Sequence, residues 1–311
     1  MLEKIGKFRD IARNFGWKAA TIILLRHLLG IDLNSIEIER KMRDALKWNF
    51  SRQAFQKHAE YRKTAIATVK TPKSIHWILP RLSAGSGGHR TASRMIQNLI
   101  DRGYNVTVWI NNPRHSDIGH LAADMERFYG VRGCTVRELQ DPSEIKCDAL
   151  IATDAWTAFP AAVAETVGRK YYFVQDYEPL FQEAGSASVF LDYTYRFGFY
   201  PITAGTWLKT MLKSRFNQSA GSFNLAVDHE IYNTSFRKDP ELPTIVFYAR
   251  GNTPRRCVEL GFMALELLKQ KLPEVQIILF GFEGKGSRLR IGAEIHGIIP
   301  PTEIAKLYAR S

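Results

Sequence analysis

From residue 74 onward, short apolar runs typical of buried strands alternate with segments in which apolar residues recur at helical spacing. The strands predicted from these runs cover residues 74–79, 106–110, 149–152, 171–175 and 201–204. The helices predicted between them cover residues 91–101, 157–167 and 207–216. Because strands that alternate with helices form parallel sheets with helices on both faces, this order predicts a doubly wound α/β domain over residues 71–233.

A polar stretch at residues 234–243 separates this domain from a second alternation of strands and helices. The predicted elements are strands at 244–248 and 275–280, a short strand within 292–298, and helices at 258–271 and 301–310. Only residues 241–311 of this second α/β domain are present, and about three strands are too few to bury both faces of a sheet. We therefore expect the second domain, and with it the chain, to be truncated.

Residues 1–70 show no strand signal and are expected to form a helical arm. The arm holds 15 Lys and Arg against 7 Asp and Glu, which is most of the net charge of +12. Its apolar stripe around residues 17–29 predicts either a helix that lies on an anionic membrane surface or one that packs on the next domain. No apolar run approaches the roughly 20 residues of a membrane span. With only three cysteines and no secretory signal, we expect a cytoplasmic protein that could touch the inner face of the membrane.

A glycine-rich loop joins the first predicted strand to the first predicted helix. Its candidate ligand-binding residues are Ser86, Gly87, Gly88 and Arg90, with His89 as a candidate catalytic residue. Glycines allow a ligand to approach the backbone, and a helix N-terminus attracts anions, so the loop predicts phosphate or sugar binding. NAD is disfavoured, because Arg90 stands where the dinucleotide fingerprint has its third glycine. The alternative is a tight turn that binds nothing.

A second candidate loop follows the first strand of the second domain and contains Arg250, Arg255 and Arg256. Three guanidinium groups in seven residues repel one another unless an anion joins them, and their planar forks match phosphate oxygens. The loop therefore predicts a diphosphate site, with a solvated basic loop as the alternative. Gly281, His296 and Gly297 follow other predicted strands of this domain and are further candidates for substrate binding.

Asp176 and Glu178 follow a predicted strand of the first domain and are candidate catalytic carboxylates. Ligands of open α/β sheets bind at the carboxyl ends of the strands. The pair could hold a divalent metal, but binding of sugar hydroxyls or capping of turns is the favoured interpretation, and no metal is expected. The sequence contains no Gly-x-Ser-x-Gly elbow, no Walker loop and no His-Glu-x-x-His motif.

Five stretches taken together resemble a known family: LSAGSGGHRTASRM (82–95), YYFVQDYEPLF (171–181), FNLAVDHEIYN (223–233), VFYARGNTPRRCVELGFMAL (246–265) and IILFGFEG (277–284). They resemble the retaining transferases of glycosyltransferase family 4, and in particular the bacterial rhamnosyltransferases that build surface polysaccharides. The resemblance covers about residues 74–311. It implies a GT-B fold of two Rossmann-like domains, in which the first binds the acceptor and the second binds the donor.

The resemblance also implies the substrates and the roles of several residues. The donor would be a nucleotide sugar, in particular dTDP-rhamnose, and the acceptor a growing surface glycan, either free or lipid-linked, with no cofactor or metal. Arg250 and Arg255 or Arg256 would bind the donor diphosphate, and Gly87 and Gly88 would lie near the donor phosphate and the acceptor. The family's acidic motif would fall beyond residue 311, so the alternative is a non-catalytic remnant that binds membrane or glycan. A nucleic-acid partner is disfavoured, because the aromatic residues lie in predicted strands rather than among basic patches.

Overall fold

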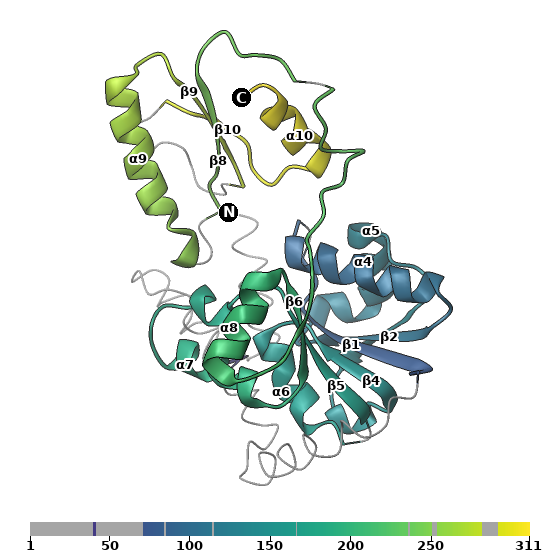
Figure 1. Cartoon of the computed structure of the whole chain (residues 1–311). Helices are drawn as coiled ribbons and strands as arrows, with labels where there is room; N and C mark the ends of the chain where they lie inside the picture. The colour runs from purple at the N-terminus through teal and green to yellow at the C-terminus, as the bar shows by residue number, and fades with distance from the viewer. Residues whose placement is uncertain are drawn as a thin grey trace, which may run out of the picture. The chain divides into compact units, whose positions relative to one another are not determined.

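The computed structural model describes residues 40–41, 71–83, 85–113, 115–165, 167–235, 237–250, 254–281 and 292–311. Apart from residues 40–41, the predicted basic arm and its apolar stripe lie outside the described residues. The chain divides into two compact units (Figure 1). Unit 1 extends to Glu178 and resumes over Val189–Phe223, whereas unit 2 comprises Pro179–Ser188 and Asn224–Ser311. The domain boundaries expected near residues 233 and 241 stay predictions, and the units are described separately below.

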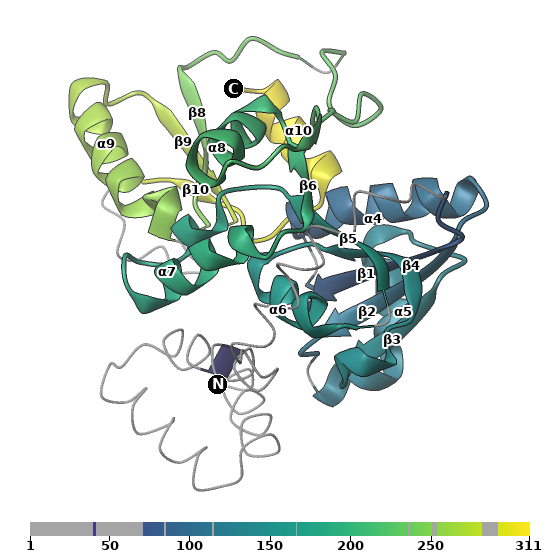
Figure 2. The same cartoon turned by 60° about the horizontal axis from the view of Figure 1, so that its bottom comes forward.

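Unit 1 is built on one seven-stranded sheet in which every neighbouring pair is parallel (Figure 2). The strands, in chain order, are β1 Ser74–Pro80, β2 Asn105–Asn111, β3 Thr135–Leu139, β4 Cys147–Ala152, β5 Val167–Val174, β6 Tyr200–Ala204 and β7 Gly221–Phe223. Their spatial order is β3-β2-β1-β4-β5-β6-β7, so the direction of winding reverses between β1 and β4. This arrangement confirms the predicted doubly wound α/β fold.

Helices cover the sheet of unit 1 and create a core on each of its faces. The helices are α4 Gly87–Asp101, α5 Leu121–Tyr129, α6 Ala155–Val163, α7 Ser186–Tyr193 (which runs into unit 2) and α8 Thr206–Phe216. Leu79 of β1 belongs to the core cluster that contains α4 and α5, whereas its neighbour Ile78 belongs to the cluster that contains α6 and α8. Because successive strand residues point to opposite faces, β1 fills both cores, which explains its nearly continuous apolar sequence.

The N-terminal ends of β1 and β4 are joined by a carboxylate. Asp148 accepts hydrogen bonds from the backbone N–H groups of Lys73 (2.8 Å) and Ser74 (2.9 Å) and from the Ser74 hydroxyl (3.1 Å). These bonds hold the pKa of Asp148 below its usual value. The carboxylate therefore fixes the register of two central strands that lie far apart in the sequence.

Unit 1 differs from the sequence prediction in three unpredicted elements and in the bounds of three others. Helix α5 and strands β3 and β7 were not predicted. Strand β3 (TVREL) contains two adjacent charged residues, and β7 is only three residues long. The predicted helix at 157–167 ends at Val163, where Ala164 turns extended, and β5 then begins at Val167 rather than at residue 171. The predicted loop around Gly87 and Gly88 is shorter, because α4 already begins at Gly87.

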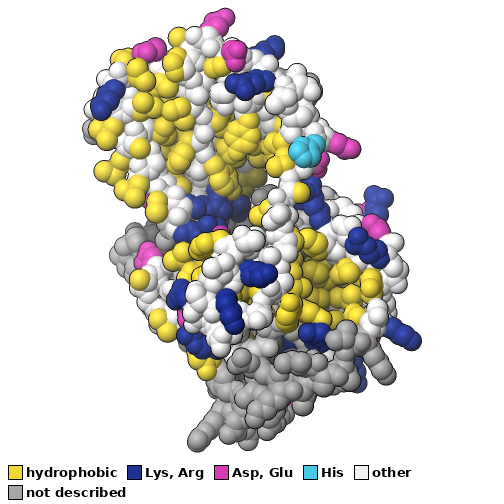
Figure 3. Space-filling view, viewed as in Figure 1, with side chains coloured by type: hydrophobic (Ala, Val, Ile, Leu, Met, Phe, Trp, Pro, Cys, Tyr) yellow, Lys and Arg dark blue, Asp and Glu magenta, His cyan; other side chains and the backbone are white. Residues whose placement is uncertain are grey.

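Unit 2 contains a three-stranded parallel sheet of order β10-β9-β8. Its elements are β8 Thr244–Tyr248, α9 Val258–Lys271, β9 Gln276–Phe280, β10 Glu294–Ile295 and α10 Pro301–Ala309, and the predicted bounds of β8 and α9 are confirmed. Leu279 and Phe280 of β9 point into separate small cores on the two faces. Large apolar side chains remain exposed on this unit, including Leu260, Met263 and Leu267 on α9, and Figure 3 shows many hydrophobic side chains on its visible face.

Candidate functional site

In each unit the predicted site residues follow the carboxyl ends of parallel strands, which lie along a single edge of the sheet. In unit 1 this edge includes the loop after β1, in which the Ser86 side chain caps α4 by accepting from the His89 backbone N–H (3.4 Å). The His89 ring is hydrogen-bonded to the Ser86 hydroxyl (2.8 Å) and the Pro80 carbonyl (3.3 Å) and stacks on Tyr129. Burial lowers the pKa of His89, so the ring is neutral near pH 7 and fixed within the loop.

The other candidates of this loop lie in the first turn of α4. Gly87 and Gly88 are exposed, and the Gly88 carbonyl accepts from the Gln175 side chain at the end of β5 (3.1 Å). Arg90 is half-buried, and its backbone N–H donates to the Ser86 carbonyl (3.1 Å). An added Cβ would meet no atom within 4 Å at Gly87, so the chain does not need a glycine there for packing. The ligand-binding roles predicted for these residues remain predictions.

The carboxylates of Asp176 and Glu178 are held by the protein itself. Glu178 is buried, and its carboxylate accepts from the backbone N–H of Ala155, the first residue of α6. Asp176 Oδ1 accepts from the backbone N–H of Tyr177 (2.8 Å). Among the described residues, no group of three or more His, Cys, Asp or Glu side chains is placed to hold a metal ion. The observed bonds fit capping of a turn and a helix; the catalytic roles are untested.

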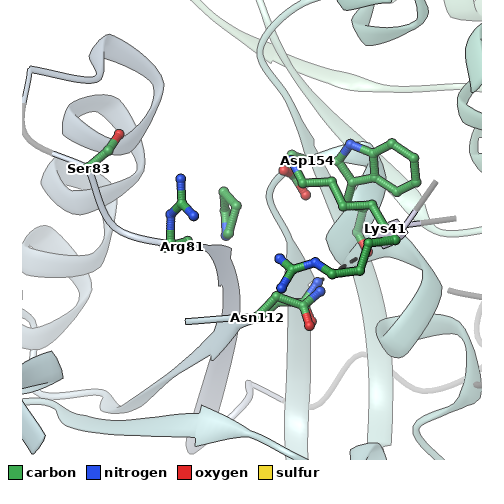
Figure 4. Close-up of a pocket in the computed structure, with 9 residues that line it drawn as sticks. Lys41, Arg81, Ser83, Asn112 and Asp154 are labelled. Carbon is green, nitrogen blue, oxygen red and sulfur yellow. Dashed lines mark hydrogen bonds between the residues drawn. The ribbon is translucent and has the colours of Figure 1, made fainter. Parts of the chain in front are cut away.

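A pocket of about 120 Å³ lies at the same edge of unit 1, where the sheet order reverses between β1 and β4 (Figure 4). The pocket is lined by Arg40, Lys41, Pro80, Arg81, Ser83, Asn111, Asn112, Asp154 and Trp156. Asp154 caps α6 through a reciprocal pair of bonds with Thr157, in which Oδ1 accepts from the Thr157 backbone N–H (2.7 Å). Burial raises the pKa of Asp154 against the opposing effects of the Thr157 bond and the Lys41 charge. The loop sequence gave no sign of this pocket, because Lys41 reaches it from a distant segment.

In unit 2 the three arginines differ in their surroundings. Arg255 is exposed, and its guanidinium lies 4.6 Å from the centroid of the Phe181 ring. Arg256 is half-buried and lies over the Tyr248 ring, 4.9 Å from its centroid. Its Nε and Nη1 atoms are buried, and neither has a hydrogen-bond partner within the part of the chain that the structure describes. Two buried N–H donors without an acceptor cost several kcal/mol, roughly 1–3 for each, so this position favours an incoming acceptor.

Tyr248, at the end of β8, reports the electrostatic potential around these arginines. Burial acts to raise the pKa of its phenol, but hydrogen bonds and charges of Arg250 and Arg256 outweigh burial, so the pKa is lowered. Gly281, at the end of β9, packs against the same ring. Its φ is +73°, and an added Cβ would approach Tyr248 Cε2 to 2.5 Å, so only glycine fits there without displacement. Tyr248 was missing from the predicted site, because in the sequence it is simply the last residue of an apolar strand.

The remaining candidates of unit 2 lie beside this group. The Gly281 backbone N–H donates to the Gly297 carbonyl (2.9 Å), which links the end of β9 to the segment after β10. The His296 ring is hydrogen-bonded to Glu294 (2.6 Å), and Arg310 also contacts that carboxylate. Arg250, Arg256, Gly281 and Gly297 therefore gather at one edge, whereas the side chain of His296 is already paired.

No family model matches the chain. Over 280 residues it is 30% identical to the O-antigen biosynthesis protein RfbC of Myxococcus xanthus, a match that covers 84% of this chain and 21% of that protein. The chain thus spans about a fifth of the length of the curated relative that it matches. No described helix is both long and apolar enough to cross a membrane.

The chain is more distantly similar to several solved structures. They include UGT89C1 of Arabidopsis thaliana complexed with UDP-L-rhamnose, at 15% identity and a TM-score of 0.44, with 76% of this chain and 72% of that chain covered. The apo form of the lipopolysaccharide outer core galactosyltransferase WaaB is 11% identical with a TM-score of 0.47, and the match covers 75% of this chain and 70% of that chain. A UGT transferase from Siraitia grosvenorii in complex with UDP is 11% identical with a TM-score of 0.39, and the match covers 73% of this chain and 74% of that chain.

Proposed function

We propose that this chain is a glycosyltransferase that transfers a sugar from a nucleotide-sugar donor to a growing surface glycan. Three observations support the proposal: the doubly wound fold, the five family-like stretches, and the similarity to an O-antigen biosynthesis protein. The observation that carries it is Arg256, whose buried Nε and Nη1 lack an acceptor at the carboxyl edge of the unit 2 sheet.

The diphosphate of the nucleotide sugar would supply the hydrogen-bond acceptor that these two nitrogens lack. Phosphate oxygens take two parallel N–H bonds from one guanidinium, and a diphosphate offers its charge to Arg250 and Arg256 together. Helix α9 begins at Val258, two residues after Arg256, so its N-terminus adds a positive potential. The sequence alone did not show whether Arg255 or Arg256 would bind the diphosphate together with Arg250. We assign the diphosphate to Arg256, because Arg255 is exposed and rests on Phe181.

In the proposed reaction, the bond between the sugar's anomeric carbon and the diphosphate breaks. An acceptor hydroxyl forms the new glycosidic bond, and its proton passes to an oxygen of the departing diphosphate. Negative charge then grows on the departing diphosphate. Arg250 and Arg256 stabilise that charge as it develops, which lowers the barrier to transfer. Because these cations can neutralise the leaving group, the reaction is proposed to need no metal, and the resemblance favours retention of configuration.

The finer substrate assignments extend the same proposal. We propose rhamnose, donated as dTDP-rhamnose, and an acceptor that is lipid-linked and presented at the inner face of the membrane. The support for these is the resemblance of the sequence stretches to surface-polysaccharide rhamnosyltransferases and the basic composition of residues 1–70. Contact with the membrane would be peripheral.

The test is calorimetric titration of the chain with UDP and dTDP. We expect Arg256→Ala to weaken binding about ten- to a hundredfold, since a hydrogen bond to a charged group contributes roughly 1.5–3 kcal/mol. Arg237→Ala is the matched control, because Arg237 is an exposed arginine of unit 2 whose contact is with Asp239. It removes the same charge and should leave the affinity unchanged. Equal affinity in the protein and in Arg256→Ala, or no binding of either nucleotide, would overturn the assignment.

A further inference from the structure

The pocket of unit 1 lies where the doubly wound sheet changes direction, a position at which such folds open a crevice between the ends of neighbouring strands. Its walls come from separate segments: Arg81 follows β1, Asn112 follows β2, Asp154 and Trp156 follow β4, and Lys41 is one of the two described residues of the N-terminal region (Figure 4). A pocket assembled from four segments at this edge is a candidate binding site in its own right.

The charges around the pocket are strongly unequal. Among the lining residues that the structure describes, Arg40, Lys41 and Arg81 are cationic, and Asp154 is the acidic residue. One oxygen of that carboxylate is already committed to the Thr157 backbone N–H at the start of α6. The N-terminus of α6, a helix of nine residues, adds further positive potential to the same wall. The pocket therefore favours a ligand group that carries negative charge.

The remaining lining is suited to a sugar ring. Trp156 is half-buried, and Lys41 Nζ lies 5.8 Å from the centroid of its indole ring. A flat apolar ring stacks on the apolar face of a pyranose, while the amide of Asn112 and the carboxylate of Asp154 can bond to hydroxyl groups. Asn112 adopts a left-handed conformation (φ 52°), which an asparagine tolerates better than most residues, and Figure 4 shows its side chain among the lining groups. A volume of about 120 Å³ suits one charged group with part of the ring that bears it.

We propose that this pocket selects an anionic sugar unit of the acceptor, one that bears a phosphate or a carboxylate. That the ligand belongs to the acceptor rests on the proposed function; the preference for an anionic sugar rests on the pocket alone. Arg81 and Lys41 bind the charged group, Trp156 stacks on the ring, and Asp154 limits the affinity for the anion while bonding to a hydroxyl.

The experiment is calorimetric titration of the full chain with four probes: glucose 6-phosphate, glucuronate, neutral glucose and inorganic phosphate. UDP is held at saturation throughout, so that the proposed donor site is occupied. We expect one of the two anionic sugars to bind at least tenfold more tightly than glucose and more tightly than inorganic phosphate. Glucose 6-phosphate and glucuronate distinguish a phosphate-bearing acceptor from a uronic acid.

Variants then tie the binding to the pocket. Arg81→Gln should weaken the binding of the preferred anionic sugar about tenfold. Arg102→Gln, at an exposed arginine after α4, should leave that affinity unchanged. Asp154→Asn should tighten binding, because it removes the described carboxylate that opposes an anion while an asparagine can still cap α6. This sign is distinctive, since a pocket that recognised a neutral sugar through its carboxylate would lose affinity in the same variant.

Three results would overturn the inference: glucose binding as tightly as both anionic sugars, Arg81→Gln without effect, or weaker binding in Asp154→Asn with its thermal stability retained. If Asp154→Asn is destabilised, the Arg81→Gln comparison decides. UDP binding that depends on Arg256, without binding of anionic sugars, would reject this inference and leave the proposed function intact. Binding of anionic sugars without nucleotide binding would reject the proposed function and leave the preference of the pocket for anionic sugars intact.

Discussion

The carboxyl edges of the two sheets look alike in topology but differ in how their polar groups are satisfied. On the edge of unit 1, Glu178 accepts from the start of α6, His89 is held by Ser86 and Pro80, and Gln175 donates to Gly88. On the edge of unit 2, two buried nitrogens of Arg256 have no acceptor among the described residues. The difference teaches that a conspicuous polar residue at a strand end can serve the fold, and that an unsatisfied donor is the better indicator of a ligand.

Gly281→Ala should have the largest effect, because the new Cβ would meet the Tyr248 ring at 2.5 Å and the residue would keep a positive φ. We expect unit 2 to lose about 2–4 kcal/mol of stability and nucleotide binding to fall at least tenfold. Thermal unfolding followed by circular dichroism, together with the UDP titration, measures both. Gly119→Ala in unit 1 is the control, since an added Cβ would meet no atom within 4 Å there, and similar losses in the two variants would contradict the contrast between the edges.

Glu178→Ala should have an intermediate effect, confined to stability. Removing the carboxylate leaves the buried Ala155 N–H without its acceptor, which costs roughly 1–3 kcal/mol. Chemical denaturation should show this loss, and Glu183→Ala, which removes an exposed carboxylate nearby in the sequence, should not. Affinity for UDP should be unchanged in both variants. A Glu178→Ala protein that is fully stable but cannot transfer sugar would instead restore the catalytic role predicted from the sequence.

The smallest effect is a spectroscopic one at Tyr248. The difference in ultraviolet absorbance between the protein and Tyr248→Phe during alkaline titration isolates the ionisation of this phenol. In Arg256→Ala the pKa of Tyr248 should rise, because a charge that favours the phenolate is gone, and saturating UDP should also raise it. An unchanged pKa under both conditions would separate Tyr248 from the anion site.

The same titration has a consequence for stability. The pKa of Tyr248 is lower in the folded protein than in the unfolded chain, so ionisation favours the folded state as pH rises through the lowered value. The contribution is complete only above the pKa of the unfolded chain. Tyr248→Phe should therefore lose stability relative to the protein at alkaline pH and not near neutrality.

The sequence predicted most of the central elements, because buried parallel strands and long amphipathic helices leave strong periodic signals. Strand β8 and helix α9 were predicted at their observed bounds. It did not reveal β3, an edge strand whose charged residues hide its extended form, or the early start of β5. These elements depend on pairing with neighbouring strands, which no local pattern records.

The candidate site residues were predicted from residue type and position along the chain. That information does not show which side chains are buried or which residues they contact. The sequence indicated that arginines would follow β8, but it could not separate Arg255 from Arg256, because burial and contact with Tyr248 arise only from packing. It drew attention to Asp176 and Glu178, yet their bonding partners are set by tertiary structure. The pocket of unit 1 was not predicted as a unit, because its lining is drawn from segments that are distant in the chain.

The reversal of winding between β1 and β4 has a consequence for how the protein is made. Strand β1 pairs with β2 about thirty residues later, as in Ile75 with Val106, but its other edge pairs with β4, as in Ile75 with Ala149. During synthesis β1, β2 and β3 therefore emerge and can assemble while that edge of β1 stays open, and Asp148 is not yet present to close it. An open edge on a strongly apolar strand invites pairing with other chains. A nascent chain released between residues 139 and 147 should thus aggregate, whereas a chain released after β4 has this edge of β1 paired.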